Sequence, residues 1–183
     1  GQTENVVEGD FHTTSLATLD DRLYGIARHV RDDGSLESEQ FLFEYLPESG
    51  TIQKLAGQLS PRAERLRITE SAFYWTRANS ESADEGTFNR DRAFLTLPRE
   101  EGATVEYLLD GLGQTTAFDI APERGLLYWG DDVDSTECEV SRGIHAQQLQ
   151  NHDFGLFDRD HPLGLAPAES GVYWIAAKIC DNV

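Results

Sequence analysis

Apolar and polar residues alternate over short stretches of the chain, and turns separate these stretches. Aromatic or aliphatic residues occupy every second position in 41–45 and in 93–97. A period of two is typical of a half-buried β-strand. The continuous apolar run 126–129 favours a buried strand, and Pro122 and Gly125 bracket a tight turn before it. Because no stretch has the apolar face of an amphipathic helix, the pattern predicts an all-β protein.

One sequence phrase recurs along the chain. A turn containing acidic residues leads into a strand that carries Tyr24, Tyr74, Tyr128 or Tyr173, and tryptophan follows the last three. The intervals between these tyrosines are 50, 54 and 45 residues. A strand-rich period of about 40–50 residues is typical of β-propellers. We therefore predict β-propeller blades of four antiparallel strands, about three and a half to four blades in this chain.

The blades are expected to form one domain over residues 1–183. Turn signals divide it into units at about 11–57, 58–113, 114–161 and 162–183. The last unit is two strands short within this sequence. An N-terminal strand at 4–9 would complete it in a four-bladed ring. Alternatively, a second propeller half completes a larger ring in a homo- or hetero-dimer. This assembly is favoured because a blade of three strands leaves a weak joint.

Residues 117–131 resemble the YWTD-type β-propeller repeats of lipoprotein-receptor ectodomains and related bacterial extracytoplasmic propellers. The segment has a strand, an acidic turn and then Tyr128-Trp129-Gly130-Asp131, where the family pattern is Tyr-Trp-Thr-Asp. Tyr74-Trp75-Thr76-Arg77 keeps three of the four positions, Tyr173-Trp174 keeps two and Tyr24 keeps one. The resemblance covers all units and implies a binding scaffold rather than a catalyst. The family usually has six blades, more than this chain fills alone.

The charge balance narrows the choice of partner. The chain has 33 acidic and 15 basic residues, a net charge of −18, and only two lysines, Lys54 and Lys178. Nucleic acid and anionic membranes would repel it. No apolar run approaches the ~18 residues of a membrane span, so no membrane insertion is expected. A basic protein surface or a hard cation is the partner that this charge favours.

Two cysteines, Cys138 and Cys180, each follow a Tyr-Trp strand. If those strands are equivalent in neighbouring units, both sulfurs lie near the same rim and a disulfide is geometrically reasonable. Such a bond would indicate an oxidising, extracytoplasmic location, secreted or periplasmic. Two unpaired buried thiols are the alternative.

Polar loops follow the second strand of each unit, at 31–35, 79–86, 131–136 and 181–183, and form the predicted recognition rim. Rigid scaffolds usually carry binding on such loops. The rim carboxylates are Asp32, Asp33, Glu81, Asp84, Glu85, Asp131, Asp132 and Asp134. Carboxylate oxygens suit Ca²⁺, so Asp131, Asp132 and Asp134 are the predicted metal ligands. A solvated acidic loop is the alternative.

Zinc is a weaker prediction. His145, His152 and His161 lie in one unit near several aspartates, but their spacings of seven and nine match no compact zinc motif. Hydrogen-bonded or surface histidines explain them better.

These features together predict a binding or scaffold module that recognises a protein partner or a cation through the acidic rim. The chain has no Gly-x-Ser-x-Gly elbow and no glycine-rich phosphate loop. A calcium-dependent propeller hydrolase, with Asp131 or Asp132 holding the ion, stays an alternative. A sugar-binding lectin using the rings at 74–75, 128–129 and 173–174 is the other. Core packing is expected for these rings, because a strand covered on both faces buries adjacent residues alike.

Overall fold

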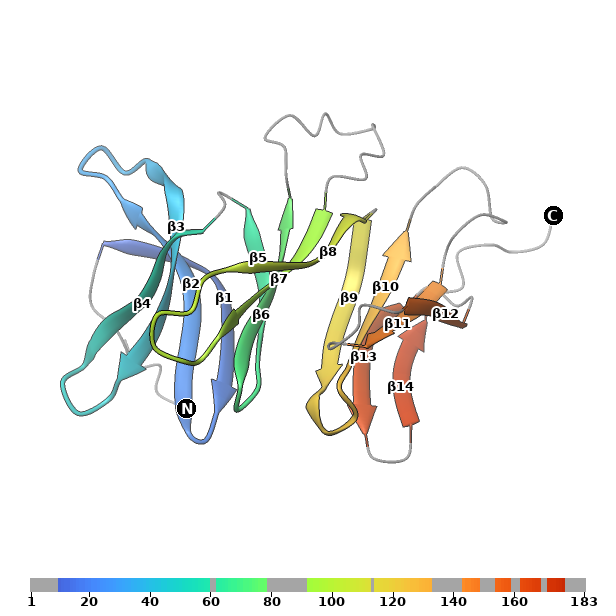
Figure 1. Cartoon of the computed structure of the whole chain (residues 1–183). Helices are drawn as coiled ribbons and strands as arrows, with labels where there is room; N and C mark the ends of the chain where they lie inside the picture. Colours follow the sequence, from blue (N-terminus) through green and yellow to red (C-terminus); the bar gives the residue numbers. More distant parts are fainter. Residues whose placement is uncertain are drawn as a thin grey trace, which may run out of the picture. The chain divides into compact units, whose positions relative to one another are not determined.

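The protein is built from β-strands in every part that the structure describes. The computed structural model describes residues 10–59, 62–78, 92–112, 114–132, 143–148, 154–158, 162–168 and 171–176. These residues form fourteen strands and one 3₁₀ turn, η1 (Pro122–Arg124) (Figure 1). No helix in this part of the chain is long and apolar enough to cross a membrane. The fourteen strands confirm the all-β prediction for the described residues.

The strands form four successive sheets, each with its strands in chain order. The first contains β1 (Phe11–Leu19), β2 (Arg22–Val30), β3 (Leu36–Leu46) and β4 (Thr51–Leu59). The second contains β5 (Ala63–Ile68), β6 (Ala72–Ala78), β7 (Arg92–Pro98) and β8 (Glu106–Leu112). The third contains β9 (Gln114–Ala121), β10 (Leu126–Asp132), β11 (Gly143–Gln148) and β12 (Phe154–Asp158). The described part of the fourth contains β13 (Pro162–Ala168) and β14 (Gly171–Ala176).

The four repeated tyrosines occupy equivalent strands. Each lies on the second strand of its sheet, on β2, β6, β10 and β14. Each of these strands pairs antiparallel with the first strand of the same sheet. The sequence repeat therefore corresponds to a repeat of four-stranded antiparallel sheets.

Local turn chemistry closes the hairpins where the sequence predicts turns. Asp20 and Asp21 have φ of 50° and 61° between β1 and β2, the left-handed values that a two-residue type I′ turn requires. Gly125 has φ of 62° after η1, and its N–H donates to the Pro122 carbonyl at 3.0 Å. Glycine adopts this conformation without steric cost.

Gly25 of β2 stands where tryptophan follows the tyrosine in the other repeats. A Cβ on Gly25 would lie 2.5 Å from Cζ of Phe43, the residue of β3 that pairs with Gly25. Phe43 is 1% exposed. The Phe43 ring thus fills the space above the glycine, and the first repeat has an aromatic core although β2 carries no tryptophan.

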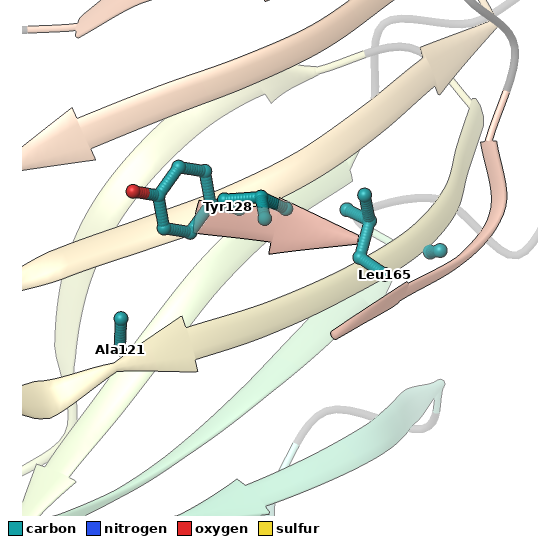
Figure 2. Close-up of a cluster of buried hydrophobic side chains, with 5 residues drawn as sticks. Ala121, Tyr128 and Leu165 are labelled. Atoms are coloured by element: carbon teal, nitrogen blue, oxygen red, sulfur yellow. The ribbon is translucent and has the colours of Figure 1, made fainter. Parts of the chain in front are cut away.

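The chain divides into two compact units. One comprises Gly1–Asn79 with Leu95–Glu106, and the other comprises Ser80–Phe94 with Tyr107–Val183. In the first unit, β1 lies against β5. In the second, β9 lies against β13, and Ala117, Ala121, Tyr128, Leu165 and Val172 form a buried cluster. Figure 2 shows Tyr128, Ala121 and Leu165 of this cluster, which come from β10, β9 and β13.

The core-packing prediction for the Tyr-Trp rings is confirmed in the second and third sheets and wrong at Tyr173. Tyr74, Trp75, Tyr128 and Trp129 are all at most 7% exposed. Tyr173 is 62% exposed, whereas its neighbour Val172 is buried. The described strands β13 and β14 bury one face against β9 and β10. Because adjacent strand residues point to opposite faces, Tyr173 faces away from that core.

Candidate functional site

The loop between β2 and β3 is the part of the predicted rim that the structure describes best. The Arg31 N–H donates to the Ser35 carbonyl at 2.8 Å, and the Gly34 N–H donates to the Arg31 carbonyl at 2.8 Å. The Ser35 N–H donates to Oδ1 of Asp33 at 2.9 Å. Asp32 and Asp33 are exposed. The loop is therefore held by its own backbone while it presents two carboxylates.

The Asp33 carboxylate is stabilised in its charged form. The Ser35 side chain, and then the Ser35 backbone N–H, lower the pKa of Asp33 by hydrogen bonding. A carboxylate that accepts such hydrogen bonds stays ionised at lower pH than a free one.

The remaining rim carboxylates fall in two groups. Asp131 and Asp132 were expected in a loop after Gly130, and this is wrong. They belong to strand β10 and pair with Thr115 and Gln114 of β9. A register shift between Gly130 and Asp131 absorbs the glycine as a bulge instead of ending the strand. The others lie outside the described residues: Glu81, Asp84, Glu85 and Asp134.

The predicted metal and disulfide residues are mostly outside the described residues too. Of the three histidines, only His145 is placed, on β11 opposite Trp129 of β10. Cys138 and Cys180 lie outside the described residues. Across the described residues, no three His, Cys, Asp or Glu side chains gather as a metal site would require. The calcium, zinc and disulfide predictions stay predictions.

Two cavities lie at opposite edges of the first unit. We call the edge with the hairpin turns 20–21, 47–50 and 99–105 the turn edge, and the edge where β2 leads into 31–35 the loop edge. The turn-edge cavity has a volume of ≈ 500 Å³. Its lining combines Tyr24, Glu44, Phe73, the β4 residues Gln53–Ala56 and the segment Leu97–Ala103.

Arg99 covers the aromatic wall of the turn-edge cavity. Its guanidinium lies 5.5 Å from the ring centroids of both Tyr24 and Phe73. Those two rings meet edge to face at 5.4 Å. Arg99 also donates to the Tyr24 hydroxyl at 3.1 Å and to the Thr69 carbonyl at 3.3 Å. The Arg99 cation is therefore engaged by the protein itself.

The loop-edge cavity has a volume of ≈ 420 Å³ and a different chemistry. It lies where the first sheet meets the start of β5. Its lining is mostly polar and includes three arginines and one glutamate: His12, Thr13, Thr14, Ser15, Arg28, Gln40, Arg62, Ala63, Glu64 and Arg65.

Gln40 fixes the floor of the loop-edge cavity. Its side chain is 1% exposed and is bonded through both amide atoms to the backbone of Ala63. The Ala63 N–H donates to Oε1 at 2.6 Å, and Nε2 donates to the Ala63 carbonyl at 3.0 Å. Nε2 also lies 3.0 Å from Oγ1 of Thr14. This clamp joins β3 and β1 to the first residue of β5.

The backbone on both sides of the loop-edge cavity departs from regular strand geometry. Register shifts occur between Thr13 and Ser15 in β1 and between Glu64 and Arg67 in β5. Arg65 has φ of 58°, a conformation that is uncommon for a residue with a side chain. The Leu66 N–H, just beyond it, donates to Oγ of Ser15 at 2.8 Å. Bulges of this kind re-aim side chains and often lie beside functional sites.

Sequence reasoning missed both cavities, although a cluster of arginines pointed to the loop-edge cavity. Three of the chain's arginines fall within 62–67, in a chain with few basic residues. That local excess of positive charge opposes the charge of the whole protein.

Comparison with known proteins adds no relative to this description. No protein-family model matches the chain, and no curated protein matches it.

Proposed function

We propose that this chain is a non-catalytic binding module of β-propeller blades, similar to YWTD-type repeats, that works outside the cytoplasm. Its acidic loop rim recognises a basic protein surface or a cation. In this proposal the Cys138 and Cys180 sulfurs are bonded, as suits an oxidising compartment.

One repeated contact carries the proposal. In the first unit the first strand of one sheet, β1, lies against the first strand of the next, β5. In the second unit β9 and β13 repeat this relation. First strands of successive sheets meet in the same way in a propeller, where they surround the central channel. The equivalent placement of Tyr24, Tyr74, Tyr128 and Tyr173 supports the same arrangement.

The loop after β2 supports the recognition role. Its hydrogen bonds keep it in one conformation, and both of its carboxylates are exposed. A rigid loop loses little conformational freedom when a partner binds. Carboxylates on such a loop attract basic side chains and steer association electrostatically.

A calorimetric titration of the full chain tests this role with two separate probes, an octalysine peptide and Ca²⁺. The Asp32→Asn/Asp33→Asn variant should lose affinity for the probe that the rim recognises. The matched control is Asp20→Asn/Asp21→Asn, which removes the same charge at the turn edge and keeps residues that tolerate a left-handed turn. Equal weakening by both variants, or no heat with either probe, would refute recognition by the rim.

Light scattering of the same protein tests the architecture. A monomer supports a four-bladed closure, and a dimer supports two propeller halves that share one ring. A still larger or indefinite assembly would contradict both closures, because propeller rings close.

The exposed ring of Tyr173 favours one second candidate, a sugar-binding propeller. A tyrosine that is 62% exposed offers a flat apolar face on which a sugar ring can stack. A glycan array with the wild-type chain and Tyr173→Ala tests it. Glycans retained by the variant would exclude this ring as the sugar site.

A further inference from the structure

We propose that the loop-edge cavity binds a single oxyanion group, the carboxylate, sulfate or phosphate of a small ligand, with Arg28 as its central donor. This site is separate from the acidic rim carboxylates, and it does not depend on closure of the sheets into a propeller. Here basic residues recognise an anion, whereas in the proposed function acidic residues recognise a basic surface or a cation.

The first observation is the charge of the cavity. Three guanidinium groups, those of Arg28, Arg62 and Arg65, line it together with His12, and Glu64 supplies the one carboxylate of the lining. The whole chain has more than twice as many acidic as basic residues. Positive charge focused in a cleft of an acidic protein raises the local concentration of a small anion.

The second observation concerns Arg28 itself. Its Nε is buried and has no hydrogen-bond partner. Among the residues that the structure describes, no hydrogen bond or ion pair involves this side chain. Arg62, Glu64 and Arg65 each make other interactions, so Arg28 is the donor left for a ligand. A buried N–H donor without a partner is costly, and an oxyanion that accepts from Nε in the cavity would remove that cost.

The third observation is how the protein positions Arg28. It lies on β2 between His12 of β1 and Gln40 of β3, which are its partners in the strand register. Cross-strand partners project from the same face of a sheet. Gln40 on that face is clamped to Ala63, so Arg28 projects from the same face as the clamp that joins β3 to the start of β5.

The chemistry of arginine selects the ligand class. A guanidinium is always charged and presents a planar fork of N–H donors that matches the oxygen atoms of a carboxylate, sulfate or phosphate. The cavity volume of ≈ 420 Å³ suits a small ligand or one terminal group of a larger one. A long polyanion is disfavoured by the net charge of −18.

The test is calorimetry of the full chain with sodium sulfate, phosphate and acetate, each against chloride at constant ionic strength. At least one of the three should bind saturably with a Kd below ~10 mM. Arg28→Gln should weaken that binding by about tenfold or more, because a hydrogen bond to a charged group is lost. The matched control is Arg22→Gln, on the same strand but exposed and outside this cavity; it should change the affinity less than about twofold.

The three anions identify the source of the oxyanion. Binding of acetate alone supports a carboxylate ligand, and binding of sulfate or phosphate supports a tetrahedral one. Arg28→Lys keeps the charge and removes the fork, so intermediate weakening is expected. Thermal unfolding of each variant establishes that it is folded. No saturable binding, or equal weakening by Arg28→Gln and Arg22→Gln, would overturn the proposal.

Discussion

The loop-edge and turn-edge cavities of the first unit each contain an arginine beside a buried polar side chain, but the protein uses these arginines differently. Arg99 at the turn edge is stacked over two rings and donates to Tyr24 and Thr69. Arg28 at the loop edge has a buried Nε with no partner. Exposure alone would mislead, because Arg99 is exposed and Arg28 is half-buried. An arginine whose donors the protein already binds stabilises the fold, whereas an arginine with an unpaired donor is available to a ligand.

This difference has an energetic meaning. An arginine that the fold itself satisfies stabilises the fold, so its removal lowers the free energy of unfolding. An arginine held without a partner contributes little to stability or opposes it, and its removal affects a ligand instead. The polar residues that support the two arginines differ in the same sense: Tyr24 accepts a hydrogen bond from Arg99, whereas Gln40 bonds the backbone and leaves Arg28 unoccupied.

The largest effect is expected from Gln40→Leu, which removes the clamp beneath the loop-edge cavity. The Ala63 N–H and carbonyl would lose buried partners, and each such loss costs about 1–3 kcal/mol, so the free energy of unfolding should fall by about 2–6 kcal/mol. Urea denaturation measures this. Gln53→Leu, an exposed glutamine at the turn edge, is the control and should stay within about 0.5 kcal/mol. A loss for Gln40→Leu no larger than the control's would show that the clamp is not structural.

Arg99→Gln should have the next largest effect. It removes two cation–π contacts on an exposed side chain and the bond to the Tyr24 hydroxyl, for a total of about 1–2 kcal/mol. Urea denaturation of Arg99→Gln, Tyr24→Phe and the double variant isolates the shared bond, because residues in contact are not additive. A double variant whose loss equals the sum of the two single losses would mean that the Arg99–Tyr24 bond contributes nothing.

Arg28→Gln should give the opposite result to Arg99→Gln. Since the fold supplies Nε of Arg28 with no partner, the free energy of unfolding without added anion should be unchanged or raised by up to about 1 kcal/mol. The same urea titration, in chloride buffer, compares it directly with Arg99→Gln. Destabilisation of Arg28→Gln by more than about 1 kcal/mol would assign Arg28 a structural role and remove the contrast between the two edges.

Local patterns were sufficient to predict the strands and their turns. The turn expected between Pro122 and Gly125 is η1, and the apolar run 126–129 after it lies in β10, because alternation and turn residues act within a few positions. The acidic turn expected before the strand of Tyr24 lies at Asp20 and Asp21 for the same reason. Gly130 was misread, because a bulge lets β10 continue to Asp132, and glycine alone does not distinguish a bulge from a strand end.

Neither cavity could be predicted in this way, because each depends on contacts between distant parts of the chain. Gln40 and Ala63 are 23 residues apart, and Arg99 and Tyr24 are 75 residues apart. Gly25 also stands where the other repeats have tryptophan. Phe43, on another strand, restores the packing, and no periodicity within one strand contains that information.

The smallest expected effect is a shift in the pKa of Asp33. It tests whether the 31–35 loop itself supplies the hydrogen bonds of this carboxylate. Hydrogen bonds from Ser35 lower the pKa of Asp33, so its carboxyl should titrate below the usual aspartate value of about 3.9. A depressed pKa means that the contribution to stability is present above the usual value and is lost as pH falls through the lower one. Ser35→Ala should shift the Asp33 midpoint upward in a carboxyl NMR titration, and Ser49→Ala, in a turn-edge hairpin, should not. An Asp33 carboxyl that titrates at or above the usual value would mean that the 31–35 loop does not hold this carboxylate. The loop edge would then have a basic cavity without a rigid acidic loop beside it.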